Sequence, residues 1–232
     1  LEDSWMSNRK NGKQMIVTGR IGNTIRRQLF LVDIKTGNYK QITYDTISYK
    51  VDPIFAGSNI LVRYRPDKNQ RQTVPAEIWN IGYLKKGVDT ILPNPIKYQI
   101  THFPKTDTGT KWFEYHAGPP QWNSKHGFIS YLSKQNGQTQ IFLVSPDLKK
   151  GFQSVTTTQL TTGNLSSGYH SWSPDGKWMV MDKSTHEGKQ FDIWLMDYKT
   201  KKEIQLTDSD KTEQAPVFVR IKNPEINFRV FY

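Results

Sequence analysis

The chain has 232 residues, a length that suits a single all-β domain. It contains no cysteine, which excludes disulfides and thiolate metal sites, and no apolar run approaches the ~18 residues of a membrane-spanning helix. The formal charge of +11 suggests nucleic-acid binding as a hypothesis. We do not favour it, because many of the lysines fall in predicted surface turns.

The first predicted unit covers about residues 3–44 and contains four short strands. Residues 4–7 and 14–17 flank a turn at Asn11-Gly12, and residues 28–33 form an apolar strand. Thr36-Gly37 supplies the glycine that a tight reversal needs for a positive φ. The unit ends on the triplet Gln41-Ile42-Thr43.

Two further units repeat this order. The second covers about residues 45–102, with strands at 52–55, 59–62 and 77–82 and the triplet Gln99-Ile100-Thr101. The third covers about residues 103–162, with a hairpin at 121–130, a strand at 140–145 and the triplet Gln159-Leu160-Thr161. Its turn before the triplet contains Lys150-Gly151, which matches Thr36-Gly37 of the first unit.

The fourth unit, about residues 163–208, is the clearest copy. Pro174 presets φ and Asp175-Gly176 close a reversal, so residues 171–181 are predicted to form a hairpin. An apolar strand at 192–197 and a turn at 199–201 lead to the triplet Gln205-Leu206-Thr207.

The triplets set the period of the chain. Their threonines lie at positions 43, 101, 161 and 207, so the steps are 58, 60 and 46 residues. Repeats near ~40–50 residues, each holding four strands, predict the blades of a β-propeller.

These residues resemble the TolB-type propeller repeat, with its Trp-Ser-Pro-Asp-Gly-Lys turn, Ile-Trp-x-x-Asp strand and terminal Gln-Leu-Thr. Residues 169–207 match it at nearly every position, and the other copies match in part, so the resemblance covers about residues 3–207. The resemblance implies an all-β, TolB-like β-propeller. It does not fix the function, because one scaffold hosts unrelated activities.

Residues 213–232 are predicted to be an incomplete fifth blade. Segments 214–218 and 226–232 read as its first two strands, and we expect them to pair. The alternative is four blades with a tail. Either the chain is a piece of a longer propeller or these strands complete an unusual closure. An open ring would expose blade edges that could pair with another chain.

Six arginines form the first candidate binding site. They lie in or beside the loops between the second and third strands of the first two blades: Arg20, Arg26, Arg27, Arg63, Arg65 and Arg71. Such loops of neighbouring blades share one rim, so we expect these side chains to converge. Guanidinium groups suit carboxylates or phosphates, which indicates an anionic surface on the partner. The alternative is a solubilising rim.

Aromatic residues and histidines in the loops between blades form the second candidate site. They are His102, Trp112, Tyr115, His116, Tyr169 and His170. Near the mouth of the central channel they would suit a peptide or a sugar, whereas the alternative is that they pack the loop onto the blade. The three histidines could hold a metal, but with neither cysteine nor paired carboxylate spacing we predict no metal and no cofactor.

No catalytic motif stands out. Residues 163–168 miss the spacing of a nucleophile elbow, and His186-Glu187 lacks the second histidine of a zinc helix. We therefore predict a non-enzymatic protein-interaction module, with no membrane insertion. The TolB resemblance implies export, in bacteria to the periplasm.

Two alternatives stay open. One is the propeller domain of a larger prolyl-oligopeptidase-like peptidase. The other is a carbohydrate-binding or lyase propeller related to oligogalacturonate lyases, which would use His102, His116 or His170.

Overall fold

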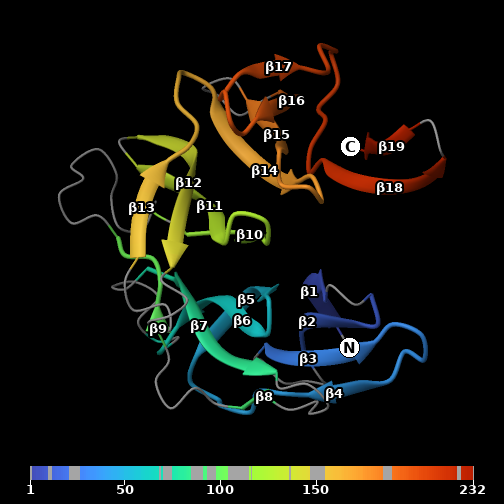
Figure 1. Cartoon of the computed structure of the whole chain (residues 1–232). Helices are drawn as coiled ribbons and strands as arrows, with labels where there is room; N and C mark the ends of the chain where they lie inside the picture. The colour runs from blue at the N-terminus through green and yellow to red at the C-terminus, as the bar shows by residue number, and fades with distance from the viewer. Residues whose placement is uncertain are drawn as a thin grey trace.

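The computed structural model confirms an all-β propeller with four blades and the first two strands of a fifth (Figure 1). It describes residues 2–9, 12–20, 27–67, 69, 75–84, 91–92, 98–103, 115, 117–135, 137–146, 155–184, 190–223 and 226–231. Within these ranges no α-helix occurs, and nothing among them is a helix long and apolar enough to cross a membrane.

Each blade is an antiparallel sheet whose strands follow chain order. The first sheet comprises β1 (Glu2–Asn8), β2 (Gln14–Arg20), β3 (Gln28–Asp33) and β4 (Tyr39–Gln41). The third comprises β10 (Gln121–Asn123), β11 (Phe128–Gln135), β12 (Gln138–Pro146) and β13 (Val155–Gln159). The fourth comprises β14 (Ser166–Trp172), β15 (Trp178–Ser184), β16 (Phe191–Asp197) and β17 (Glu203–Gln205).

The second sheet has an extra outer strand that the sequence did not predict. It comprises β5 (Tyr49–Ala56), β6 (Asn59–Arg65), β7 (Glu77–Leu84), β8 (Ile91–Leu92) and β9 (Tyr98–Gln99). Both β8 and β9 pair with β7, at Tyr83–Leu84 and Trp79–Asn80 respectively. The outer edge of this blade is therefore built from two short pieces.

The fifth, partial sheet contains β18 (Val217–Asn223) and β19 (Ile226–Phe231), which pair antiparallel as predicted. The first of these strands begins at Val217, later than the predicted start at Gln214. β18 contacts β14 of the fourth sheet. In Figure 1 the sheets follow one another in an arc around a common centre, with the first sheet and β18–β19 at its two ends.

The hydrophobic core lies between successive sheets, because each sheet is apolar on both faces. Alternate residues of one strand point to opposite faces. On β11, Ile129 and Tyr131 pack toward the second sheet, whereas Phe128 and Leu132 pack toward the fourth. A third cluster joins the first and second sheets in the same way. This two-sided burial explains the short, nearly continuous apolar runs of the sequence.

The repeated triplet is a side-chain clip that fixes the outermost strand. In all four copies the glutamine Nε2 donates to the threonine carbonyl, at 2.8–2.9 Å. Each threonine Oγ1 accepts the amide of a third-strand residue, at 2.8–2.9 Å, from Leu29, Ile78, Ile141 and Ile193. The period of the sequence thus reflects one hydrogen-bonded unit made four times.

The tryptophans near the ends of the first strands pack between sheets. Trp172 lies edge-on to Phe128 of the third sheet, with ring centroids 5.2 Å apart, and its Nε1 donates to Ser130 Oγ at 2.8 Å. Trp122 packs against the cluster shared by the second and third sheets. The side chain of Trp5, expected at an equivalent position, lies outside the described part of the structure.

Candidate functional site

A cavity of about 430 Å³ lies where the second, third and fourth sheets and the segment before β18 meet. Its size falls within the range of small-molecule and side-chain binding pockets. The residues that line it are Asp52, Arg63, Gly118, Pro119, Leu132, Thr139, Ser166, Ser167, Gly168, Tyr169, Asp182, Ser184, Phe191 and Gln214.

One wall of the cavity carries an ion pair. Asp52, on β5, lies beside a β-bulge with a φ of 50°, and its Oδ2 is 2.9 Å from Nε of Arg63 on β6. Burial raises the pKa of the Asp52 carboxyl, while the positive charges of Arg63 and Arg27 oppose that rise. Gly118 allows close approach here, because a Cβ at this position would lie 3.3 Å from Arg63 Cδ.

The fourth sheet contributes a second carboxylate to the lining, Asp182 on β15, which is fully buried. Its Oδ2 accepts the amide of Ala215 at 2.8 Å, whereas Oδ1 makes no well-aligned hydrogen bond within the described residues. Burial raises the pKa of Asp182 to about 6, although the backbone amides of Ala215 and Tyr169 stabilise the charged carboxylate and lower its pKa in part. At neutral pH this carboxylate is therefore mostly ionised.

Gly168 on β14 is required by this carboxylate. A Cβ built on Gly168 would lie 1.6 Å from Asp182 Oδ1, closer than any real contact. The neighbouring Ser167 is buried and shares hydrogen bonds with Thr161 and Gln140, which hold β14 against the third sheet. Tyr169, by contrast, is 46% exposed and is an aromatic residue of the cavity lining.

A serine–histidine pair occurs elsewhere and does not line the cavity. Ser130 Oγ and His170 Nε2 are 2.8 Å apart, but both residues are buried. Burial lowers the pKa of His170 to about 4, so the ring is neutral at pH 7. Because Trp172 also donates to Ser130 Oγ, these three side chains join the third and fourth sheets. No substrate can reach Ser130 in this arrangement.

The structure places the predicted arginines differently from one another. Arg63 pairs with Asp52 in the cavity wall. Arg65 is buried, with its guanidinium 5.2 Å from the ring centre of Tyr49. Arg20 ends β2 and Arg27 precedes β3, both half-buried. Arg26 and Arg71 lie outside the described residues.

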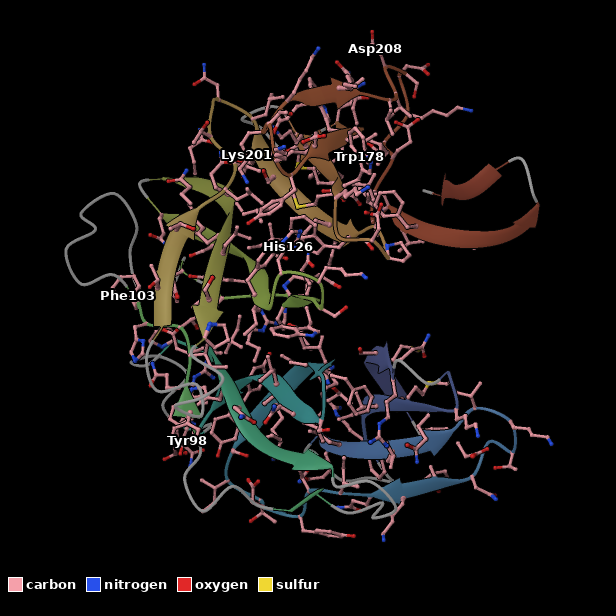
Figure 2. The ribbon with its side chains drawn as sticks, in the orientation of Figure 1. Tyr98, Phe103, His126, Trp178, Lys201 and Asp208 are labelled. Carbon is pink, nitrogen blue, oxygen red and sulfur yellow. The ribbon has the colours of Figure 1, made fainter. Side chains whose placement is uncertain are left out.

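The predicted aromatic and histidine residues are also dispersed. Tyr169 and His170 lie inside β14, which begins at Ser166, rather than in the preceding loop as predicted. His102 is exposed, whereas Tyr115 is buried in the core. Trp112 and His116 lie outside the described residues. Figure 2 shows Phe103 at the flank of the molecule; its ring is 5.1 Å from that of Tyr115.

Tyr115 anchors its loop through a buried acid. Its hydroxyl donates to Glu77 Oε2 at 2.9 Å, and the same oxygen accepts Thr101 Oγ1 at 2.6 Å. The Phe103 amide donates to Glu77 Oε1 at 2.6 Å. Burial raises the pKa of Glu77 to about 6, and burial together with the Glu77 charge raises the pKa of Tyr115. Tyr115 thus packs the loop onto the blade and does not face the cavity.

The sequence reading missed Asp52, Asp182, Ser166 and Gln214 as site residues. A signal existed for Asp182, because an acid directly follows the buried run Met179-Val180-Met181. Buried carboxylates without a charged partner are costly and mark candidate sites. Within the described residues no three His, Asp or Glu side chains group as a metal site would require.

Searches of protein-family models and of curated protein sequences both found no match. Solved structures do resemble the chain. TolB from Acinetobacter baumannii matches with a TM-score of 0.61 at 18% identity, over 92% of this chain and 45% of that one. The chain therefore has a TolB-type fold and spans less than half of that protein.

Two enzymes carry the same fold. An oligogalacturonate lyase in complex with manganese matches with a TM-score of 0.58 at 16% identity, over 88% of this chain and 53% of that one. A Mycobacterium tuberculosis puromycin-hydrolyzing peptidase matches with a TM-score of 0.62 at 10% identity, over 93% of this chain and 33% of that one. The fold is thus shared by TolB proteins, lyases and peptidases.

Proposed function

We propose that this chain is a non-enzymatic interaction module that holds a protein partner on the loop face of the propeller, at the central cavity. The observation that carries the proposal is the cavity itself, which combines buried carboxylates, hydroxyl groups and the exposed Tyr169. Polar groups of this kind fix the orientation of a ligand inside an otherwise apolar pocket.

The six arginines remain part of the proposal. Arg20, Arg26 and Arg27 of the first blade and Arg71 of the second would meet acidic groups of the partner around the rim. Arg63 and Arg65 would support the site from within. The TolB resemblance supports a place in the bacterial periplasm. The proposal includes no membrane insertion, cofactor or metal.

A capture experiment with matched tyrosine variants tests the proposal. The immobilised chain is incubated with a bacterial envelope extract, and bound proteins are identified by mass spectrometry. Tyr169→Ala should reduce capture of the specific partner at least tenfold. Tyr39→Ala is the control, because Tyr39 is 55% exposed on the outer strand β4, away from the cavity lining. Equal capture by both variants would remove the cavity from the binding surface.

The structural likeness to enzymes favours a second candidate, the propeller domain of a larger peptidase or lyase. The lyase part of this candidate is tested directly on the chain, by assaying cleavage of oligogalacturonate, and we expect no activity. The peptidase part is tested by the sequence downstream of residue 232 in the gene, where a hydrolase domain with a nucleophile elbow would support it. Oligogalacturonate cleavage that survives purification and is lost in His102→Ala would overturn the non-enzymatic proposal.

A further inference from the structure

The cavity has a charge of the opposite sign to the whole chain. The chain carries a formal +11, whereas the ionised lining residues are Asp52, Arg63 and Asp182, which together carry one net negative charge. Arg63 pairs with Asp52, and Arg27 also acts on Asp52 from outside the lining, so the negative charge without a cationic partner belongs to Asp182.

Asp182 keeps one carboxylate oxygen without a well-aligned hydrogen-bond partner in the described part of the chain. Its side chain is completely buried, yet Oδ1 lacks a hydrogen bond of good geometry, and no cationic side chain of the described residues forms an ion pair with it. Asp52 is 4% exposed and likewise leaves Oδ1 without a hydrogen bond. Buried charges are stable only when paired, so the Asp182 carboxylate, which has no cationic partner among the described residues, favours a cationic ligand.

The rest of the lining suits a cation on an aliphatic stem. Leu132 and Phe191 provide apolar wall, and Tyr169 provides a ring on which a cation can stack. Hydroxyl and amide oxygens of Ser184 and Gln214 can accept further N–H groups. A lysine or arginine side chain combines these features: an apolar stem and a terminal group with several donors.

We propose that the cavity binds an alkylammonium or guanidinium group, contributed by a lysine or arginine side chain of the partner, with Asp182 as its principal counter-charge. This inference rests on the proposed function, because it takes the cationic side chain to belong to a protein partner. The chemistry of the cavity itself can be tested on the chain alone. The cationic group enters between Asp182 and the Asp52–Arg63 pair.

The test is a titration of the ¹⁵N-labelled chain, followed by NMR and calorimetry. The probes are Nα-acetyl-lysine amide, Nα-acetyl-arginine amide, the neutral Nα-acetyl-norleucine amide, and spermidine as a free amine. The lysine and arginine probes should shift the amide signals of Ala215 and Tyr169, which flank the Asp182 carboxylate. The norleucine probe should not shift them.

Two carboxylate variants and a control sharpen the test. Asp182→Asn should weaken binding of the lysine probe at least tenfold. Asp210→Asn makes the same charge change at an exposed residue outside the cavity lining and should leave the affinity within twofold. Should Asp182→Asn fail to fold, Asp52→Asn provides the second readout, because it removes the negative charge of Asp52 and leaves Arg63 uncompensated in the cavity wall.

The outcomes separate this inference from the proposed function. Equal binding of the lysine and norleucine probes, or an affinity unchanged in both carboxylate variants, overturns the cation site. If partner capture persists in Asp182→Asn and no amine binds, the proposed function stands and this inference fails. If only spermidine binds, the cavity takes a free amine and the protein-partner function fails.

Discussion

At the scale of single residues, one threonine hydroxyl in each of the four blades accepts a third-strand amide, and its burial differs between blades. Thr161 accepts the Ile141 amide at 2.8 Å, donates to Gln140 Oε1 at 2.6 Å and lies 3.0 Å from Ser167 Oγ. Thr207 makes the equivalent bond with the Ile193 amide, but it is only half-buried. The two positions therefore differ in access to water and in the further hydrogen bonds that Thr161 makes with Gln140 and Ser167.

This difference gives a matched pair of substitutions. Thr161→Val keeps the side-chain shape but leaves the buried Ile141 amide without an acceptor, which should lower the free energy of unfolding by about 1–3 kcal/mol. Thr207→Val should cost less, because water can replace the lost hydroxyl. Urea denaturation measures both. Equal losses of unfolding free energy would show that burial of the Thr161 hydroxyl adds nothing to its contribution to stability.

In the first three blades, the residue just before the threonine-held amide of the third strand is matched to the loop that it meets. Gln28 Nε2 donates to the carbonyl of Asp45, and Gln140 Nε2 donates to that of Leu165. Glu77 occupies the same position in the second blade, but its loop presents the amide of Phe103, which needs an acceptor. A carboxylate is therefore the residue that fits, despite its burial.

Glu77 should make stability depend on pH. Burial raises its pKa from 4.5 to about 6, so the folded state binds this proton more tightly than the unfolded chain. Its contribution to stability is complete below pH 4.5 and is lost as pH rises through 6. The difference in unfolding free energy between wild type and Glu77→Gln should fall by on the order of 2 kcal/mol between about pH 4 and pH 7.

Urea denaturation at a series of pH values checks this prediction. The groups that face Glu77 are Thr101, Tyr115, Tyr131 and the Phe103 amide, and neither tyrosine ionises in this range because their pKa values are raised. Asp210→Asn serves as the control, since that residue is exposed. A difference that stays constant with pH would contradict the assignment.

At the scale of elements, the hairpin turn between β14 and β15 docks on the preceding blade. Gly176 has a φ of 73°, and its carbonyl accepts Asn123 Nδ2 at 3.3 Å. A Cβ at Gly176 would lie 2.8 Å from Asn123 Oδ1 and 2.9 Å from Lys125 Cβ. Figure 2 shows His126, from the same turn as Lys125, between the third and fourth sheets.

Alanine substitutions separate the two reasons for a glycine at position 176, its positive φ and its close contact with the preceding blade. Gly37 has nearly the same φ, 72°, and a Cβ placed on it would meet nothing within 4 Å, so Gly37→Ala should cost only the ~1 kcal/mol of the left-handed conformation. Gly176→Ala should cost at least about 1 kcal/mol more, because the docked turns must also separate. Thermal unfolding of both variants decides whether the contact matters.

Sequence reasoning predicted the elements better than the site. The triplets, the Asp-Gly turn and the apolar runs located the blades, since each is a local pattern tied to one backbone geometry. β8 was missed because Ile91-Leu92 is too short to show any alternation. Asp52 and Asp182 are 130 positions apart, and only the arc of sheets brings them to one cavity. No local sequence pattern predicts that these two residues line the same cavity.

At the scale of the whole molecule, the strands at the end of the arc carry exposed apolar residues. Val217 and Val219 on β18 are 46% and 39% exposed, and β19 pairs along this strand. Removing residues 226–232 would leave the β18 edge open beside these valines. We expect the truncated chain to self-associate, because unpaired apolar edges recruit other strands.

Size-exclusion chromatography with light scattering measures this association. Replacing Val217 and Val219 with lysine in the truncated chain should restore the monomer, since charge on an edge strand opposes pairing. A truncated chain that stays monomeric and keeps its unfolding midpoint would show that β19 neither prevents self-association nor stabilises the fold.

The side-chain clip of the triplets also sets how each blade exchanges its amide hydrogens. The amides of Leu29, Ile78, Ile141 and Ile193 are held by threonine hydroxyls, and all four residues are fully buried. We expect these contacts to persist when the short, exposed strands β4 and β17 fray and their ladder bonds break. These four amides should therefore exchange their hydrogens far more slowly than the amides of the flanking strands. Their exchange rates would report how often each blade opens in the native state.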